Sequence, residues 1–526
     1  MQELVYHRLL LPALDRFADK EGFVDGDYVG TYADHGDRVF RLSHAMRHQL
    51  GVSRSDRFAV MAANSHQYLE LYHAAFLGAG VINPLNLRLA GAELDYIVRD
   101  SGTEVVFVDA FFAQHLANAI AASDTPSPIR HVVLIGDGNA DSGVPHDLKY
   151  EELVAAGEPI VPIEPDETDL AVLMYTGGTT GLPKGVAIEH RAEMLNFYHI
   201  GMILDMDEDL TYLHQTPMFH AASMGGLIGT PATGGKSVFI PMFEPGAVLD
   251  LIERYQVTQT VMVPTMIAML LNHESFRPER LSSMRLLTYG ASPMPAGLLT
   301  RMLEMFPDLE LSQGYGMTEA SALLTWLDAD DHRTGGARLR SAGRAVPGVL
   351  LSIRDDDGSE VATGETGEVW AKAGNFMREY WNKPEATEEV FAEGWYHSGD
   401  AGYLDDDGFL FLVDRVKDMI VTGGENVYSA EVEGALTKHP AVDQAAVIGI
   451  PHDTWGEQVH AIVVLLPDHE VTEEELQSFT REHIAGFKVP KSVEFRTEPL
   501  PLSGALKVLK RELRKPYWEG HDRGVG

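Results

Sequence analysis

The segment Tyr175-Thr-Gly-Gly-Thr-Thr-Gly-Leu-Pro-Lys-Gly-Val186 lies between two short apolar runs, 170–175 and 186–189, that predict β-strands. Glycine lets backbone amides approach an anion closely, and this segment adds threonine hydroxyls and one lysine charge to them. It is not a Walker loop, because Pro183 precedes the lysine and Gly185 follows it. The segment therefore predicts a phosphate-binding loop between two strands, with a flexible surface loop as the ordinary alternative.

The sequence around this loop alternates short apolar runs with helical patterns, which is typical of strands and crossover helices in an α/β fold. The expected strands are 105–109, 132–136, 170–175, 186–189, 237–240, 258–263 and 286–289, and helices are expected at 247–255 and 294–305. After about residue 344, closely spaced glycines among β-prone residues predict hairpins. Beyond Arg415 the pattern predicts a helix at 430–437, strands at 445–450 and 458–466, and a capped helix at 472–483.

These patterns predict an α/β protein with two domains. Residues 1–415 are expected to form a large N-terminal domain of layered βα subdomains, which includes a small β-rich subdomain at about 344–415. Residues 416–526 are expected to form a small, mobile α+β C-terminal domain. The chain of 526 residues is long enough for several hydrophobic cores.

Composition limits the classes of function. The chain has 41 Lys and Arg against 78 Asp and Glu, a formal net charge of −37, which argues against nucleic acid as a partner. The absence of cysteine excludes disulfides, thiolate zinc sites and a cysteine nucleophile, and it favours the cytoplasm. The first residues do not resemble a signal peptide. Residues 211–235 lack Asp, Glu, Lys and Arg, but their His, Pro and Gly make a poor membrane span, so no transmembrane segment is expected.

Further motifs follow the phosphate-binding loop in order. Gln313-Gly-Tyr-Gly-Met-Thr-Glu319 brings an aromatic ring, a hydroxyl and a carboxylate close together in the sequence. The others are Gly290-Ala-Ser292, Gly394-Trp-Tyr-His-Ser-Gly-Asp400, Asp414-Arg-Val-Lys-Asp418 and Gly423-Gly-Glu-Asn-Val-Tyr428. From about Thr176 to Lys507 the chain resembles the adenylate-forming (AMP-binding) superfamily, which contains acyl-CoA synthetases, peptide-synthetase adenylation domains and beetle luciferases.

The resemblance implies a site for ATP and Mg²⁺. The implied phosphate-binding residues are Thr176, Gly177, Gly178, Thr179, Thr180 and Lys184. Tyr315, between Gly314 and Gly316, would stack on adenine, and Gly290, Ala291 and Ser292 would line the adenine and acyl sites. Thr318 would contact the α-phosphate. Glu319 and Thr176 would hold Mg²⁺, which suits hard oxygen ligands beside phosphates.

The later motifs imply contacts to ribose and CoA, and a hinge. Asp400 would accept the ribose hydroxyls, with Arg415 as a second ribose or phosphate contact. Lys417 stands at the position of the family's hinge, and Gly423 and Gly424 would let a thiol arm pass close to the backbone.

The C-terminal lysine departs from the family pattern in one respect. Lys507 matches the family's adenylation lysine, but Leu506 replaces the usual glycine before it, and Lys510 is the fallback candidate. A lysine in a basic C-terminal run is ordinarily a solvated residue.

The segment Thr216-Pro-Met-Phe-His-Ala-Ala-Ser-Met-Gly225 bears on the acid substrate. The resemblance implies that His220 gates the acyl site, although a core histidine is the common alternative, and a metal role is not expected. Gly225, Gly226 and Gly229 predict a roomy apolar tunnel. Such a tunnel favours a medium- or long-chain fatty acid, with an aryl or polycyclic acid, such as a steroid or terpenoid acid, as the alternative.

The resemblance implies a stand-alone, AMP-forming acyl-CoA ligase that uses a small-molecule carboxylic acid, ATP, CoA and Mg²⁺, because no carrier-protein segment follows the small domain. The catalytic residues are expected to be Lys184, His220, Thr318, Glu319 and Lys507. A non-catalytic nucleotide-binding or acyl-binding relative and a luciferase-type oxidase are the other functions that the sequence allows. The oligomeric state is left open, a homodimer included.

Overall fold

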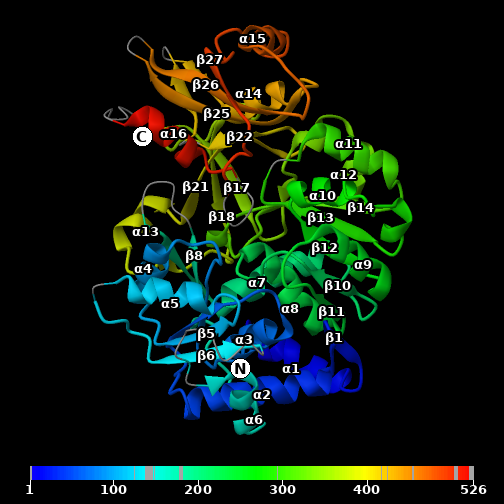
Figure 1. Cartoon of the computed structure of the whole chain (residues 1–526), viewed down its shortest axis with the longest axis vertical. Coiled ribbons are helices and arrows are strands. Elements are labelled where there is room, and N and C mark those ends of the chain that lie inside the picture. The colour runs from blue at the N-terminus through cyan, green and yellow to red at the C-terminus, as the bar shows by residue number, and fades with distance from the viewer. Residues whose placement is uncertain are drawn as a thin grey trace. The chain divides into compact units, whose positions relative to one another are not determined.

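The computed structural model describes residues 3–123, 125–136, 146, 148–176, 182–292, 294–415, 418–422, 425–452, 455–502 and 508–519. The chain folds as two compact units (Figure 1). The first contains Met1–Leu339, Gly343–Leu350 and Lys372–Phe391, and the second contains Arg340–Ala342, Leu351–Ala371 and Ala392–Gly526. The expected domain boundary near residue 416 stays a prediction.

One sheet of the first unit carries the phosphate-loop segment. Its strand order is β19-β9-β8-β4-β3-β5-β6-β7. The strands are β3 Arg57–Met61, β4 Val81–Pro84, β5 Val105–Asp109, β6 His131–Ile135, β7 Leu148–Lys149, β8 Leu170–Thr176, β9 Lys184–Glu189 and β19 Glu379–Tyr380. Strands β3 to β8 pair in parallel and read as nearly continuous apolar runs, as expected for strands buried on both faces. Strands β8, β9 and β19 pair antiparallel at one edge.

The second sheet of this unit has the order β16-β15-β14-β13-β12-β10-β11-β1-β2. The strands are β1 Glu21–Asp25, β2 Tyr28–Thr31, β10 Thr211–His214, β11 Lys236–Phe239, β12 Gln259–Met262, β13 Leu286–Gly290, β14 Glu310–Tyr315, β15 Thr325–Leu327 and β16 Arg344–Ala345. Strands from β1 to β14 along this order are parallel, and the outer pairs are antiparallel. The carboxyl ends of β13 and β14 therefore meet at one edge, where open α/β sheets bind ligands.

Helices connect and cover these strands. They are α1 His7–Arg16, α2 Tyr32–His48, α3 His66–Phe76, α4 Gly91–Ser101, α5 Ala113–Ala121, α6 Tyr150–Ala156, α7 His190–Ile203, α8 Met224–Thr233, α9 Pro245–Tyr255, α10 Pro264–Leu271, α11 Ala296–Met305, α12 Ala329–Thr334 and α13 Pro384–Val390. Short 3₁₀ turns are η1 Ala221–Ser223, η2 Pro278–Leu281, η3 Thr318–Ala320 and η4 Gly336–Arg340. Helix α9 begins where Glu244 accepts hydrogen bonds from the amides of Gly246 and Ala247. Figure 1 shows α9, α10 and α11 beside the strands β12 to β14.

The second unit contains two smaller sheets. One has β17 Leu350–Arg354, β18 Gly367–Lys372, β20 Phe391–Ala392, β21 Trp395–Leu404 and β22 Leu410–Arg415. The other has β23 Ile420–Thr422, β24 Glu425–Val427, β25 Val442–His452, β26 Gly456–Leu465 and β27 Ser492–Arg496, with helices α14 Ser429–Leu436, α15 Glu473–Arg481 and α16 Lys510–Trp518. Val432, Leu436, Val447, Val463 and Leu476 belong to the core between this sheet and helices α14 and α15.

The observed elements confirm the expected α/β class and the hairpins after residue 344. The expected capped helix at 472–483 is α15, in which Thr472 and Glu475 form a reciprocal capping box. The uncharged stretch 211–235 folds as β10, η1 and the buried helix α8. Among the described residues, no helix is both long and apolar enough to cross a membrane.

Candidate active site

Strands β8 and β9 hold the ends of the phosphate-loop segment together. They pair antiparallel, with Thr176 opposite Lys184. The Tyr175 hydroxyl donates to Asp100 Oδ2 at 2.7 Å, which ties the end of β8 to α4. A Cβ at Gly185 would lie 2.9 Å from Tyr175 Cζ, so the close packing leaves no room for a side chain there. Gly177, Gly178, Thr179 and Thr180 lie outside the described residues.

Tyr380 on β19 joins two of the predicted site residues. Its hydroxyl donates to Glu319 Oε1 at 2.7 Å, and the Lys184 ammonium lies 4.7 Å from the centroid of its ring. The Met377 amide also donates to the backbone carbonyl of Glu319 at 2.7 Å. The structure therefore places the predicted phosphate lysine and the predicted magnesium carboxylate around one tyrosine, Tyr380, which no sequence motif marks.

The adenine motif and the Gly290 turn are neighbours, as expected. Gly290 pairs with Gly314 across the parallel strands β13 and β14. A Cβ at Gly290 would lie 2.4 Å from the Gly314 carbonyl oxygen, and a Cβ at Gly316 would lie 2.0 Å from the Ala322 carbonyl oxygen. Ala291 has a φ of 64°, a left-handed conformation that is uncommon for a residue other than glycine. Close backbone packing thus fixes both turns at the carboxyl edge of the sheet.

The turn that follows Glu319 has an internal anchor in Asn375. This side chain is buried, and its amide donates to the carbonyls of Ala320 at 2.8 Å and Leu323 at 3.0 Å. The Ser321 hydroxyl donates to the Asn375 carbonyl at 2.8 Å. The half-buried residues Tyr315, Thr318 and Glu319 all belong to the segment that these bonds hold.

The His220 segment is fixed by polar side chains from helix α3 and from the loop before it. Asn64 donates to the carbonyls of His214 and Thr216 at 3.1 and 3.0 Å, and its Oδ1 accepts from the Met218 amide at 2.9 Å. Tyr72 on α3 donates to the Met218 carbonyl at 2.6 Å. His220 itself is half-buried and packs at 4.5 Å, between ring centroids, against Phe219.

The structure corrects the prediction of a roomy tunnel at the α8 glycines. A Cβ at Gly225 would lie 3.2 Å from Ile200 Cδ1, and a Cβ at Gly226 would lie 2.4 Å from Tyr212. At Gly229 the nearest atom would be Met206 Cε at 2.5 Å. These glycines therefore admit neighbouring side chains close to α8, and the missing side chains do not by themselves leave open space.

In the second unit, the predicted ribose residues are cross-strand neighbours. Asp400 on β21 pairs with Arg415 on β22. Asp400 is buried, with 8% of its surface exposed, and its amide donates to the Ser398 hydroxyl at 3.0 Å. The preceding residue, Gly399, has a φ of 68°. This turn thus depends on a conformation that glycine adopts readily.

Glu368 on β18 anchors the same turn. Its Oε1 accepts from the Gly399 amide at 3.0 Å, and its Oε2 accepts from the Trp370 indole at 2.9 Å. His397 stacks on Trp370 with ring centroids 3.7 Å apart. Glu368 therefore positions this turn, and no sequence motif marks it.

Lys510, the fallback adenylation lysine, is held inside the second unit. Its ammonium lies 2.7 Å from Glu433 Oε1 and 2.5 Å from the Ser429 hydroxyl. Although burial lowers the pKa of Lys510, the charges of Glu433 and Asp414 raise it above its ordinary value. Lys510 therefore has a structural role, which leaves Lys507 as the candidate. Lys507, Lys417, Gly423 and Gly424 lie outside the described residues.

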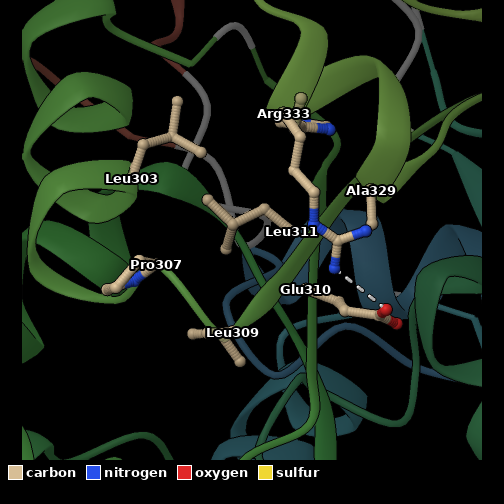
Figure 2. Close-up of a pocket in the computed structure, with 8 residues that line it drawn as sticks. Leu303, Pro307, Leu309, Glu310, Leu311, Ala329 and Arg333 are labelled. Carbon is tan, nitrogen blue, oxygen red and sulfur yellow. Dashed lines mark hydrogen bonds and ion pairs between the residues drawn. The ribbon is translucent and has the colours of Figure 1, made fainter.

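A groove of about 270 Å³ lies elsewhere on the first unit (Figure 2). Its lining includes Leu303 on α11, Leu311 at the start of β14 and Ala329 on α12, and Arg333 forms an ion pair with Glu310 at 3.1 Å. None of its lining residues is a predicted site residue. The groove is at the opposite end of β14 from Tyr315.

The two sheets, the phosphate-loop strands and the glycine turns at the carboxyl edge define a nucleotide-binding α/β enzyme. The sequence matches the family model for AMP-binding enzymes over residues 12–381 and the model for the AMP-binding enzyme C-terminal domain over residues 431–507. The chain belongs to the AMP-binding enzyme family.

Individual relatives and solved structures show which enzymes of this family the chain resembles. The chain is 38% identical over 490 residues to a feruloyl-CoA synthase of Amycolatopsis sp., which covers 93% of this chain and 94% of the relative. It is 34% identical over 490 residues to a long-chain-fatty-acid–CoA ligase of Mycobacterium tuberculosis, with 93% of both chains covered. The ATP-bound structure of MatB from Rhodopseudomonas palustris has a TM-score of 0.86 at 29% identity and covers 99% of this chain and 100% of that one.

These comparisons confirm the expected family, fold class and chemistry: the protein is an AMP-forming acid–CoA ligase that works with ATP, CoA and Mg²⁺. Carboxylate and hydroxyl oxygens are the donors that Mg²⁺ prefers, so Glu319 and Thr176 fit this ion chemically. Among the described residues, no group of three or more His, Asp and Glu side chains could hold a metal on its own.

Proposed function

We propose that this ligase activates an aryl carboxylic acid as an acyl-adenylate and then transfers the acyl group to CoA. The observation that supports the adenylation site best is Tyr380, which contacts both Lys184 and Glu319. The aryl class is supported by the relative at 38% identity that is named feruloyl-CoA synthase. A medium- or long-chain fatty acid is the second candidate, because relatives at 33–34% identity are named long-chain-fatty-acid–CoA ligases.

In the first step, an oxygen of the substrate carboxylate attacks the α-phosphorus of ATP, and the bond to pyrophosphate breaks. Both reactants are anions, so Lys184 and Lys507 are assigned to neutralise charge as the new bond forms. Thr318 is assigned to orient the α-phosphate, and Tyr315 to hold adenine by stacking. Mg²⁺, when bound by Glu319 and Thr176, supplies further positive charge to the phosphates.

In the second step, the thiol of CoA attacks the acyl carbon and AMP leaves. Asp400 and Arg415 are assigned to hold the ribose, and Gly423 and Gly424 to line the path of the thiol arm. Lys507 and the incoming thiol need the same face of the acyl-adenylate, so the C-terminal domain is proposed to rotate about Lys417 between the steps. His220 is assigned to gate the acyl site.

Exchange of radiolabelled pyrophosphate into ATP tests the first step. Exchange that depends on an added carboxylic acid and needs no CoA is expected. An absence of exchange with every acid would indicate a non-catalytic family member. Oxygen uptake after adenylation would indicate the luciferase-type reaction.

A rigid hinge is expected to separate the two steps. Lys417→Pro fixes φ near −65° and should lower CoA thioester formation on the order of 10²-fold, while acid-dependent pyrophosphate exchange continues. Rapid-quench measurement of each half-reaction checks this. Lys417→Ala is the control, since it removes the charge and leaves the backbone free to rotate. Normal thioester formation by Lys417→Pro would reject the hinge.

Removing the anchor of the Asp400 turn is expected to weaken ATP binding. Glu368→Ala deletes the acceptor for the Gly399 amide and the Trp370 indole. Each such bond contributes about 0.5–1.5 kcal/mol, so the KM for ATP should rise about tenfold, with a smaller change in kcat. The exposed Glu360→Ala in the same unit is the control. A loss of kcat at unchanged KM for ATP would contradict this role.

A further inference from the structure

Helix α4 ends with an acidic residue, which is an unfavourable choice for a helix end. Asp100 is the penultimate residue of Gly91–Ser101, and Gly102 ends the helix with a φ of 63°. A negative charge in the last turn faces the negative end of the helix dipole, which costs about 0.3–1 kcal/mol. An aspartate at this position therefore needs an explanation, and its contacts supply one.

The carboxylate of Asp100 contacts the start of the phosphate-loop segment. Its Oδ2 accepts the hydrogen bond from the Tyr175 hydroxyl at 2.7 Å, and Tyr175 immediately precedes Thr176, the last residue of β8. Burial, followed by the bond to Asp100 and the charge of Asp100, raises the pKa of Tyr175, so the tyrosine stays a donor. A hydrogen bond to a carboxylate is stronger than one between neutral groups.

The backbone carbonyl of Asp100 contacts the segment that follows β19. It accepts hydrogen bonds from the Trp381 indole at 2.9 Å and from the Asn382 side-chain amide at 3.0 Å. The last four carbonyls of a helix lack partners within the helix, and these bonds satisfy one of them. Asn382 has a φ of 55°, which asparagine tolerates better than most residues. The chain after Tyr380 thus turns back onto the same residue of α4.

The contacts of Tyr175 and Trp381 meet at the other end of the phosphate loop. The Trp381 amide donates to the Gly185 carbonyl at 2.7 Å. A Cβ at Gly185 would lie 2.9 Å from Tyr175 Cζ and 3.2 Å from Trp381 Cβ. Gly185 follows Lys184, the first residue of β9. Asp100 therefore holds the strand ends on both sides of the phosphate loop, through Tyr175 and through Trp381.

We propose that Asp100 is a positioning residue for the β- and γ-phosphates of ATP. It acts through Tyr175 on the start of the phosphate loop and through Trp381 on the end of the loop. This inference rests on the proposed function, in which Thr318 orients the α-phosphate, and it assigns the loop to the two phosphates that AMP lacks. A loop that is held at both ends loses less conformational freedom when it binds its ligand, and this increases the affinity.

The test compares the binding of ATP with the binding of AMP. Isothermal titration calorimetry with Mg²⁺ and without the acid substrate measures both dissociation constants. In Asp100→Ala and in Tyr175→Phe, the Kd for ATP should rise about tenfold while the Kd for AMP stays unchanged. The double variant should also lose about tenfold, and not about a hundredfold, because both substitutions remove the same bond. Asp100→Asn keeps an acceptor for the tyrosine hydroxyl and should retain most of the affinity for ATP.

Two exposed residues on other elements provide matched controls. Asp308 precedes β14 and Tyr198 lies on α7, so Asp308→Ala and Tyr198→Phe should leave both dissociation constants unchanged. Equal weakening of ATP and AMP, or an additive loss in the double variant, would give Asp100 a general structural role and overturn the inference. If Asp100→Ala does not fold, Tyr175→Phe, which removes one oxygen atom, decides by the same comparison.

Failure of the proposed function is measured separately. If the wild type exchanges no pyrophosphate into ATP with any acid, the proposed ligase reaction is wrong. A selective loss of ATP affinity in the Asp100 and Tyr175 variants would still support the positioning role.

Discussion

Lys507→Ala is expected to slow acyl-adenylate formation about 10²- to 10³-fold and to spare thioester formation from supplied acyl-adenylate. The reason is that the lysine charge is needed while the carboxylate attacks the α-phosphate, and the second step has no such build-up of charge. Acid-dependent pyrophosphate exchange measures the first half-reaction. Conversion of synthetic acyl-AMP and CoA to the thioester measures the second.

Two other lysines provide controls for this prediction. Lys515→Ala removes an exposed charge from α16 and should leave both half-reactions unchanged. Lys510→Ala removes the partner of buried Glu433 and should lower the melting temperature, since an unpaired buried charge is strongly destabilising. Equal losses in both half-reactions of Lys507→Ala would reject the assignment of this lysine to the first step.

Glu319→Gln is expected to lower the rate of adenylation about 10²-fold or more. The concentration of Mg²⁺ needed for activity should also rise. The substitution keeps the shape of the side chain and an acceptor for the Tyr380 hydroxyl, so the loss would report the missing negative charge. The initial rate of pyrophosphate release across a Mg²⁺ titration is the measurement.

Tyr380→Phe provides the matched comparison at this site. It removes only the hydroxyl that donates to Glu319 and keeps the ring beside Lys184. Loss of one such hydrogen bond should lower the rate of adenylation about 3- to 10-fold, which is less than the loss expected for Glu319→Gln. If Glu319→Gln behaved like the wild type at low Mg²⁺, the assignment of Glu319 to the metal would be wrong.

Much of the α/β fold could be predicted because its strands are local patterns. The apolar run of β5 between polar residues predicts a buried strand with the observed bounds, Val105–Asp109. The parallel strands β13 and β14 place Gly290 beside Gly314, as expected for motifs at the ends of neighbouring strands. Periodicity alone does not define the order of strands in either sheet, since that order depends on contacts between distant segments.

The site was only partly predictable, because some of its contacts join segments that are far apart in the sequence. Motifs and the family resemblance pointed to Lys184, Glu319 and Asp400, whose assigned roles stay predictions. Tyr380 and Asn375 act on a segment 52 to 61 residues away, and no spacing in the sequence marks them. Glycine was misread at Gly225, Gly226 and Gly229, because it can either leave space or admit a neighbouring side chain, and only packing distinguishes the two.

This enzyme is proposed to form an acyl-adenylate from an aryl acid and to pass the acyl group to CoA. A panel of aryl, fatty and polycyclic acids, assayed for release of AMP and pyrophosphate with and without CoA, tests it most directly. Without CoA, we expect acid-dependent release of pyrophosphate. AMP and thioester should appear only with CoA, and kcat/KM should be highest for an aryl acid. Thioester formation without pyrophosphate release, or no turnover of any acid, would contradict it.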